Sequence, residues 1–329
     1  MNRSSTRGRA ALGSFVLACA AALVSPVASA APLLRAADGT AGAMAMLSSA
    51  AQQSLAAQVR EARSHARAAF SAVANLAGLR PAVYRTTRYQ RPSVARELRG
   101  LGTGALLPML DVLAVGGYPH SLNAEERDVL EVGLLDAVGV LRDTRAEPVL
   151  RAAFLGSPLD AGVLAAAQGL GALCRDSDIA LLVCHRADAG ARGAAAIEGL
   201  GHCRRIEAVR PLAAALDGAT APETVRAAAR GLAHVGSTWA QQVASNRRLP
   251  YDPAVPTLAA QSLVAAYARA LESGADGPVR DELAYAILAV GHANSPRLLT
   301  EAAQRTTQPA TRTALGALAA TAQRALRRR

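Results

Sequence analysis

The residues best suited to metal chemistry are three histidines that follow one position of a repeated motif. This position recurs every 30 to 32 residues and is occupied by Gly139, Gly171, Gly201 and Ala233. His202 and His234 directly follow it, and His292 follows Gly291 in the same way. Equivalent positions in stacked repeats form a column, so we expect a histidine row along one edge of the molecule.

Zinc or copper needs imidazole nitrogens about 2 Å from one ion. Neighbouring packed helices lie about 8–10 Å apart, so ligands from successive repeats converge only with help. Cys203 and the Cys184-His185 pair are the available helpers. Histidines at helix C-termini also stabilise the negative end of the helix dipole. We therefore predict no metal and no cofactor, and keep a metal- or ligand-binding edge as the alternative.

Three cysteines follow the N-terminal segment: Cys174, Cys184 and Cys203. Cys174 and Cys203 occupy nearly the same place in consecutive repeats. A disulfide needs α-carbons within about 7 Å, which is less than the usual helix spacing. The favoured interpretation is three small residues buried between repeats, although an oxidising compartment would allow one internal bridge and one remaining thiol.

Motifs for nucleophilic or phosphoryl chemistry are absent from the sequence. It contains no Gly-x-Ser-x-Gly elbow and no glycine-rich phosphate loop. The acidic pairs Glu125-Glu126 and Asp281-Glu282 stand where helices begin, and acidic residues there stabilise the helix dipole. We predict that the chain is not an enzyme.

The elements that position these residues are two-helix units. A period near 30 residues is typical of stacked helical hairpins, because a lone hairpin cannot bury its apolar face. The sequence predicts an all-α fold, an α-solenoid of about six stacked antiparallel helix pairs over 93–329. An N-terminal helical extension and an arginine-rich linker fill 31–92. Prolines are expected in or near the first turn of leading helices, at Pro108, Pro148, Pro211, Pro256 and Pro296.

The segment Pro222–Ala233, with the sequence PETVRAAARGLA, resembles the trailing helix of a HEAT repeat, as does 190–210. The similarity extends over about 95–329 and is to the short bacterial repeats also found in bilin-lyase subunits. The resemblance implies a binding scaffold. The enzymatic members, of the deoxyhypusine hydroxylase type, hold iron with adjacent His-Glu pairs, and this sequence has no such pair.

Residues 1–30 have the parts of a secretory signal peptide. Three arginines precede an apolar run, and Ala28-Ser29-Ala30 has the small residues of a cleavage site. We expect a periplasmic or secreted protein that begins near Ala31, with no transmembrane span in the mature chain. The alternatives are an uncleaved anchor and lipid attachment at Cys19, which follows Leu17-Ala18.

All the basic residues are arginine. Removing the signal leaves 33 of the 36 basic residues against 25 acidic ones, a net charge of +8. An exported basic protein meets acidic protein surfaces and anionic envelope components, so we expect no nucleic acid partner.

The period lengthens between Ser237 and Asp252, where an insertion carries the chain's one tryptophan. Trp, Tyr and Arg are enriched at interface hot spots, and insertions in repeat arrays often form binding faces. The insertion is interpreted either as a recognition loop or as a strap packed on the solenoid. The candidate binding residues in it are Trp239, Arg247, Arg248 and Tyr251. On trailing helices, the candidates for polar contacts are Arg192, Arg226, Arg230 and Arg280.

The sequence thus predicts an exported, non-catalytic scaffold or adaptor that binds another macromolecule, most simply a protein, through a helical-repeat surface. The alternatives are a metal- or ligand-binding envelope protein that uses the His/Cys edge, and an accessory subunit of an enzyme.

Overall fold

The computed structural model describes residues 47–77, 93–115, 117–218, 221–246 and 251–328, all within one compact unit that spans 36–329. These residues form α-helices and short 3-10 helices and contain no strand, which confirms the all-α prediction. None of the described helices is both long enough and apolar enough to cross a membrane. The predicted signal peptide and the predicted linker at 80–92 lie outside the described residues.

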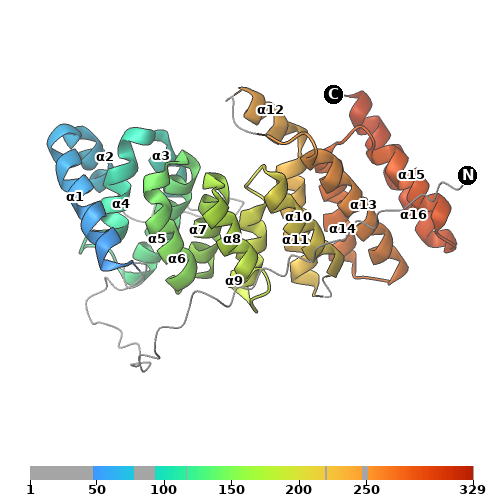
Figure 1. Cartoon of the computed structure of the whole chain (residues 1–329), viewed down its shortest axis with the longest axis horizontal. Helices are drawn as coiled ribbons and strands as arrows, with labels where there is room; N and C mark the ends of the chain where they lie inside the picture. The colour runs from blue at the N-terminus through green and yellow to red at the C-terminus, as the bar shows by residue number, and fades with distance from the viewer. Residues whose placement is uncertain (1–46, 78–92, 116, 219–220, 247–250, 329) are drawn as a thin grey trace, which may run out of the picture. The chain divides into compact units, whose positions relative to one another are not determined.

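Six helix pairs follow one another along the chain (Figure 1). The first three are α4 (Leu106–Ala114) with α5 (Ala124–Leu141), α6 (Glu147–Gly156) with α7 (Asp160–Leu173), and α8 (Asp176–His185) with α9 (Ala191–Leu200). The last three are α10 (Ile206–Gly218) with α11 (Pro222–Gly236), α13 (Val255–Glu272) with α14 (Gly277–Val290), and α15 (Ser295–Arg305) with α16 (Pro309–Arg327).

The first members of these pairs, the leading helices, form one layer, and the second members, the trailing helices, form the other. Trailing helices α5, α7, α9, α11 and α14 pack on one another in chain order, and leading helices α8, α10, α13 and α15 do the same. Each helix therefore buries its apolar face against its partner and its neighbours. This arrangement confirms the predicted α-solenoid of about six pairs.

Three N-terminal helices continue the same packing. They are α1 (Ser49–His65), α2 (Arg67–Ala77) and α3 (Ser93–Gly100), of which α3 packs on α5 while α1 and α2 pack against α4. Arg63 forms an ion pair with Asp111 of α4, and its guanidinium lies 5.0 Å from the centre of the Phe70 ring. The extension is therefore built onto the first repeat.

The motif glycines allow the trailing helices to touch backbone to backbone. A Cβ atom added at Gly171 would lie 1.8 Å from the Gly199 carbonyl oxygen, and one at Gly201 would lie 2.4 Å from the Gly231 Cα. At Gly139 the Cβ would come within 2.7 Å of Gly169. The recurring Gly-Leu-Gly triplet follows from this, because its first glycine receives the preceding helix and its second contacts the next.

Four of the five predicted first-turn prolines, Pro108, Pro148, Pro256 and Pro296, lie in the first turn of α4, α6, α13 and α15. The prediction is wrong for Pro211, which lies inside α10. The helix begins about a turn earlier than the proline indicates, because Ala208 and Val209 are already buried against the core. The first part of the insertion forms an extra helix, α12 (Thr238–Asn246), between α11 and α13.

Candidate binding groove

A groove of about 290 Å³ lies over the C-terminal ends of the trailing helices and is bordered by α12. Helices α3, α5, α7 and α11 contribute residues to it, as does the turn after α9. Its lining consists of Arg99, Asp136, Gly139, Val140, Arg142, Ala165, Gln168, Gly169, Ala172, His202, Arg204, His234, Trp239 and Val243. The close contact of Gly139 with Gly169 forms part of its floor.

Two exposed apolar side chains line the groove. Trp239, near the start of α12, is 60% exposed, and Val140, near the end of α5, is 45% exposed. The Ser237 hydroxyl accepts a hydrogen bond from the Ala240 amide at 3.0 Å and so caps the helix that carries Trp239. The Trp239 and His234 rings form a T-shaped pair, with centroids 6.3 Å apart and an interplanar angle of 69°. Because Trp239 is largely exposed, it fits a recognition loop better than a strap packed on the solenoid.

The histidine row is a pair rather than a column of three. The rings of His202 and His234 are tilted by 30°, with centroids 4.3 Å apart. The expectation of a full helix spacing between them is wrong, because Gly201 and Gly231 let α9 and α11 approach closely. His292 lies elsewhere, where its ring contacts the Thr257 hydroxyl and accepts a hydrogen bond from the Asn294 amide.

Three arginines and one aspartate give the groove its charge. Arg99 lies 3.7 Å from Asp136, while Arg142 caps α5 in the left-handed conformation with φ 56°. The side chain of Arg204 is only 6% exposed. The sequence interpretation missed all three arginines, although Arg142 and Arg204 each stand three residues after a motif glycine and could have been found by that register.

The third residue after Gly171 is Cys174, and it forms a disulfide with Cys203, with α-carbons 5.0 Å apart. The bond corresponds to the alternative of one internal bridge and not to the favoured interpretation of three buried cysteines, because the close approach of α7 and α9 at Gly171 and Gly199 brings the repeats nearer than a usual helix spacing. Cys184 was expected to be buried, and it is exposed instead. The disulfide holds the chain between His202 and Arg204, which both line the groove.

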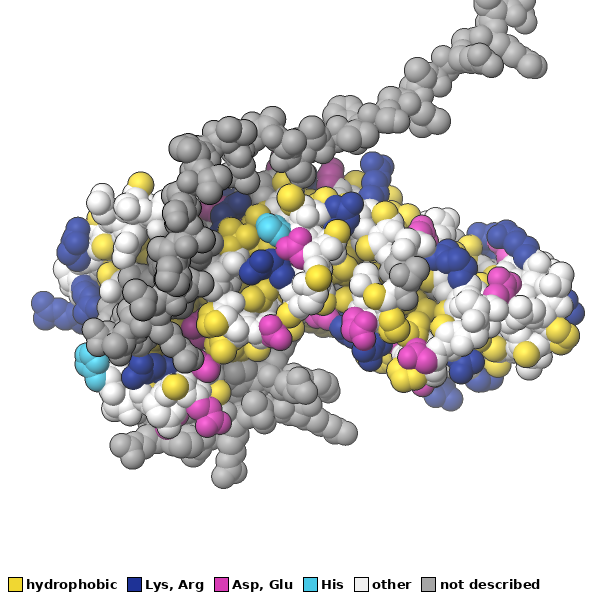
Figure 2. All heavy atoms as spheres, turned by 90° about the horizontal axis from the view of Figure 1, so that it is seen from below, with side chains coloured by type: hydrophobic (Ala, Val, Ile, Leu, Met, Phe, Trp, Pro, Cys, Tyr) yellow, Lys and Arg dark blue, Asp and Glu magenta, His cyan; other side chains and the backbone are white. Residues whose placement is uncertain are grey.

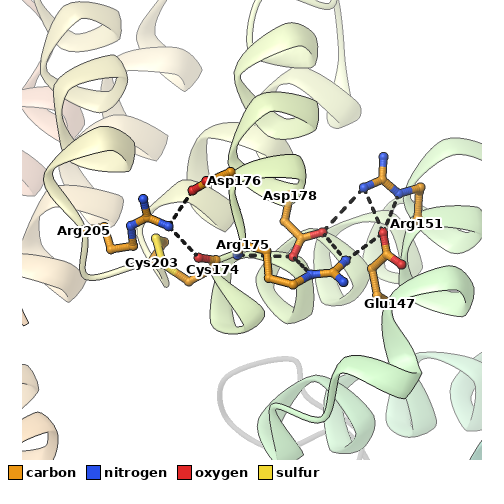
Figure 3. A network of polar contacts seen from close by, with 8 residues as sticks. All are labelled: Glu147, Arg151, Cys174, Arg175, Asp176, Asp178, Cys203 and Arg205. Carbon is orange, nitrogen blue, oxygen red and sulfur yellow. Dashed lines mark hydrogen bonds and ion pairs between the residues drawn. A yellow bond between two sulfur atoms is a disulfide. The ribbon is translucent and has the colours of Figure 1, made fainter. Parts of the chain in front are cut away.

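Polar contacts on the leading layer surround the same disulfide (Figure 3). Arg205 donates to Asp176 at 2.7 Å and to the Cys174 carbonyl at 3.4 Å. Arg175 bridges Glu147 of α6, at 2.8 Å, and the fully buried Asp178 of α8, at 3.1 Å. The network joins α6, α8 and the start of α10.

Two of the four trailing-helix arginines predicted for binding make contacts inside the fold. Arg230 of α11 pairs with Glu198 of α9 and lies 3.6 Å from Glu282 of α14. Arg192 donates to the Leu155 carbonyl at 2.9 Å. The remaining two candidates are Arg226, which is half-buried, and Arg280, which is exposed. None of the four lines the groove.

Tyr251 anchors the end of the insertion. Its hydroxyl donates to the Val235 carbonyl at 3.3 Å, and burial raises its pKa to about 12. Arg247 and Arg248 lie outside the described residues.

No family model and no curated protein matches the chain. Among solved structures, human deoxyhypusine hydroxylase in complex with glycerol matches 82% of this chain and 98% of that chain, with 16% identity and a TM-score of 0.28. A similarity at that TM-score assigns no activity.

No group of three or more His, Cys, Asp and Glu side chains that could hold a metal occurs among the described residues. The sulfur of Cys203, which could have joined the histidine pair, is bonded to Cys174. The His202–His234 pair is therefore the part of the groove that comes nearest to a metal site, with two imidazole ligands.

A buried polar cluster lies nearer the N-terminal half of α5. Ser157 donates to the Glu131 carboxylate at 3.0 Å, and the Tyr118 hydroxyl lies 3.4 Å from its other oxygen. Burial raises the pKa of Glu131 above its ordinary 4.5, and the negative charge of Asp128 adds to this, while the two hydrogen bonds partly oppose it. The cluster links the turns before α5 and α7.

Proposed function

We propose that this protein is an exported, HEAT-like scaffold that binds another protein in the groove beside Trp239. The observation that carries the proposal is the exposure of Trp239 and Val140 at a groove lined by arginines. Exposed aromatic side chains beside arginines are typical of interface hot spots. The described residues contain three large exposed apolar side chains, and two of them meet at this groove.

The composition of the groove favours binding over catalysis. Its lining includes no serine, threonine, cysteine or lysine that could act as a nucleophile. Its one carboxylate, Asp136, faces Arg99. The proposed role is therefore non-catalytic.

The histidine pair favours one other class, an envelope protein that binds a metal ion. Structural zinc sites have four protein ligands and catalytic sites three, and the pair supplies two. The disulfide removes the sulfur ligand that this alternative needs. Protein binding is the stronger proposal.

The test compares two exposed aromatic residues. Trp239→Ala changes the groove, whereas Tyr285→Ala removes a side chain that is 68% exposed on α14 and does not line the groove. Each protein is secreted by a Gram-negative host and purified from the periplasm, where the mature N-terminus should be Ala31. Immobilised protein then captures partners from envelope extract. We expect Tyr285→Ala to capture the same partner as the wild type and Trp239→Ala to lose it. The N-terminus of the purified protein tests export separately, and an unprocessed N-terminus would contradict it.

A further inference from the structure

The charged side chains that line the groove are mainly basic. Arg99, Arg142 and Arg204 line it with a single acidic side chain, Asp136. The side chain of Arg204 is 6% exposed, so water screens its charge less than that of a surface arginine. A partially buried cationic lining favours an anionic ligand and opposes a basic one.

Nonpolar surface adjoins these charges. Trp239 on α12 and Val140 on α5 are both exposed at the groove, and Val243 also lines it. A ligand that carried charge alone would leave this surface in water. The groove therefore fits a peptide in which carboxylates alternate with an aliphatic or aromatic side chain.

We propose that the segment bound in the groove is an acidic peptide that places a nonpolar side chain against Trp239. The inference rests on the proposed protein-binding function and adds the chemical class of the bound segment.

Other anionic macromolecules fit less well. Membrane surfaces are typically recognised by clusters of about four to eight basic residues, and single-stranded nucleic acids by several stacked aromatic rings. The groove has three arginines and one tryptophan. Figure 2 shows the face seen from below, away from α12, and on it basic and acidic side chains are interspersed with apolar ones.

Basic residues at helix C-termini also have a purely structural explanation. Each helix C-terminus carries a partial charge of about −0.5, and Arg142 caps α5. That interaction needs no ligand and acts mainly within the last turn. It predicts that removal of the Arg142 charge changes stability and leaves peptide affinity unchanged.

Trp239 is the only tryptophan, so its fluorescence reports on the groove directly. The probe is a blocked decapeptide of eight glutamates and two leucines, and the control peptide has glutamine in place of every glutamate. We expect a saturable fluorescence change with the acidic peptide, an affinity at least about ten-fold lower for the glutamine peptide, and weaker binding as salt is raised.

Arg142→Gln should lower the affinity for the acidic peptide by about three- to ten-fold, which corresponds to the loss of one charge-assisted contact. Arg142→Lys should bind like the wild type. Arg210→Gln, the same substitution at an exposed arginine of α10 outside the groove lining, should also bind like the wild type. Thermal melts establish that each variant is folded.

Equal affinity for the two peptides, or an unchanged affinity in Arg142→Gln, would overturn the inference. Tighter binding of phosphatidylglycerol vesicles or of single-stranded DNA than of the acidic peptide would also overturn it. If Trp239→Ala loses its captured partner while the acidic peptide fails to bind, the inference alone is wrong. If Trp239→Ala and Tyr285→Ala capture equally, the proposed function itself is wrong.

Discussion

At the scale of single residues, the backbone contacts of the motif glycines determine how closely the repeats stack. Gly171 and Gly201 lie where a Cβ atom would overlap the backbone of the next trailing helix. By contrast, a Cβ added at Gly316 of α16 would meet nothing within 4 Å. The same substitution therefore has opposite expected effects at the two kinds of position.

Gly171→Ala should lower the free energy of unfolding by about 1–3 kcal/mol, because the helices must separate to admit the methyl group. Gly316→Ala should raise it by about 0.5–1 kcal/mol, since alanine favours the helix. Urea denaturation of both variants measures these changes. A stabilised Gly171→Ala protein would show that the close contact does not exist.

Glu131 is expected to make stability depend on pH. The pKa of Glu131 is raised in the folded state, so the protonated carboxyl group stabilises the fold. This stabilisation is fully present below the ordinary pKa of 4.5 and is lost as the pH rises through the raised pKa of the folded protein. Glutamine can keep hydrogen bonds to Ser157 and Tyr118 without a buried charge. Glu131→Gln should therefore gain stability relative to the wild type between pH 4 and pH 7.

Denaturation series at the two pH values, with Glu125→Gln as an exposed control on the same helix, provide the measurement. A difference between Glu131→Gln and the wild type that does not change with pH would disprove this role of Glu131.

At the scale of elements, a disulfide and a salt-bridge network hold consecutive repeats together at the centre of the chain. The Cys174–Cys203 bond joins the end of α7 to the turn after α9, and Arg205 reaches back from the start of α10 to Asp176. The sequence reveals this junction only partly. The repeated position of the cysteines predicts that they lie in neighbouring repeats, but an average helix spacing argues against a bond between them. The close contact of Gly171 with Gly199 shortens that spacing.

Replacing both Cys174 and Cys203 by serine should lower the free energy of unfolding by about 3–4 kcal/mol, because the bond closes a loop with a sequence separation of 29 residues. Cys184→Ser, at an exposed site outside the disulfide, is the matched control. Equal denaturation midpoints for the double variant and the wild type under non-reducing conditions would contradict a structural role for the bond.

At the scale of the whole molecule, the 30-residue period predicts the two-layer stack of helix pairs, because each repeat must bury its apolar face against the next. The groove is less predictable, since it depends on how far five helix ends approach one another. The composition and the break in the repeat period identify Trp239 as a candidate binding residue. The repeat register marks Arg142 and Arg204 as equivalent positions, but only the three-dimensional structure brings them together with Arg99.

The central claim is that the groove beside Trp239 binds a protein partner, and the affinity of that partner for Trp239→Ala and Tyr285→Ala tests it most directly. Loss of a hot-spot side chain typically costs about 2 kcal/mol or more, so Trp239→Ala should bind about 30-fold or more weakly, with the fold intact. Tyr285→Ala should match the wild type. Equal, wild-type affinities of both variants would contradict the account.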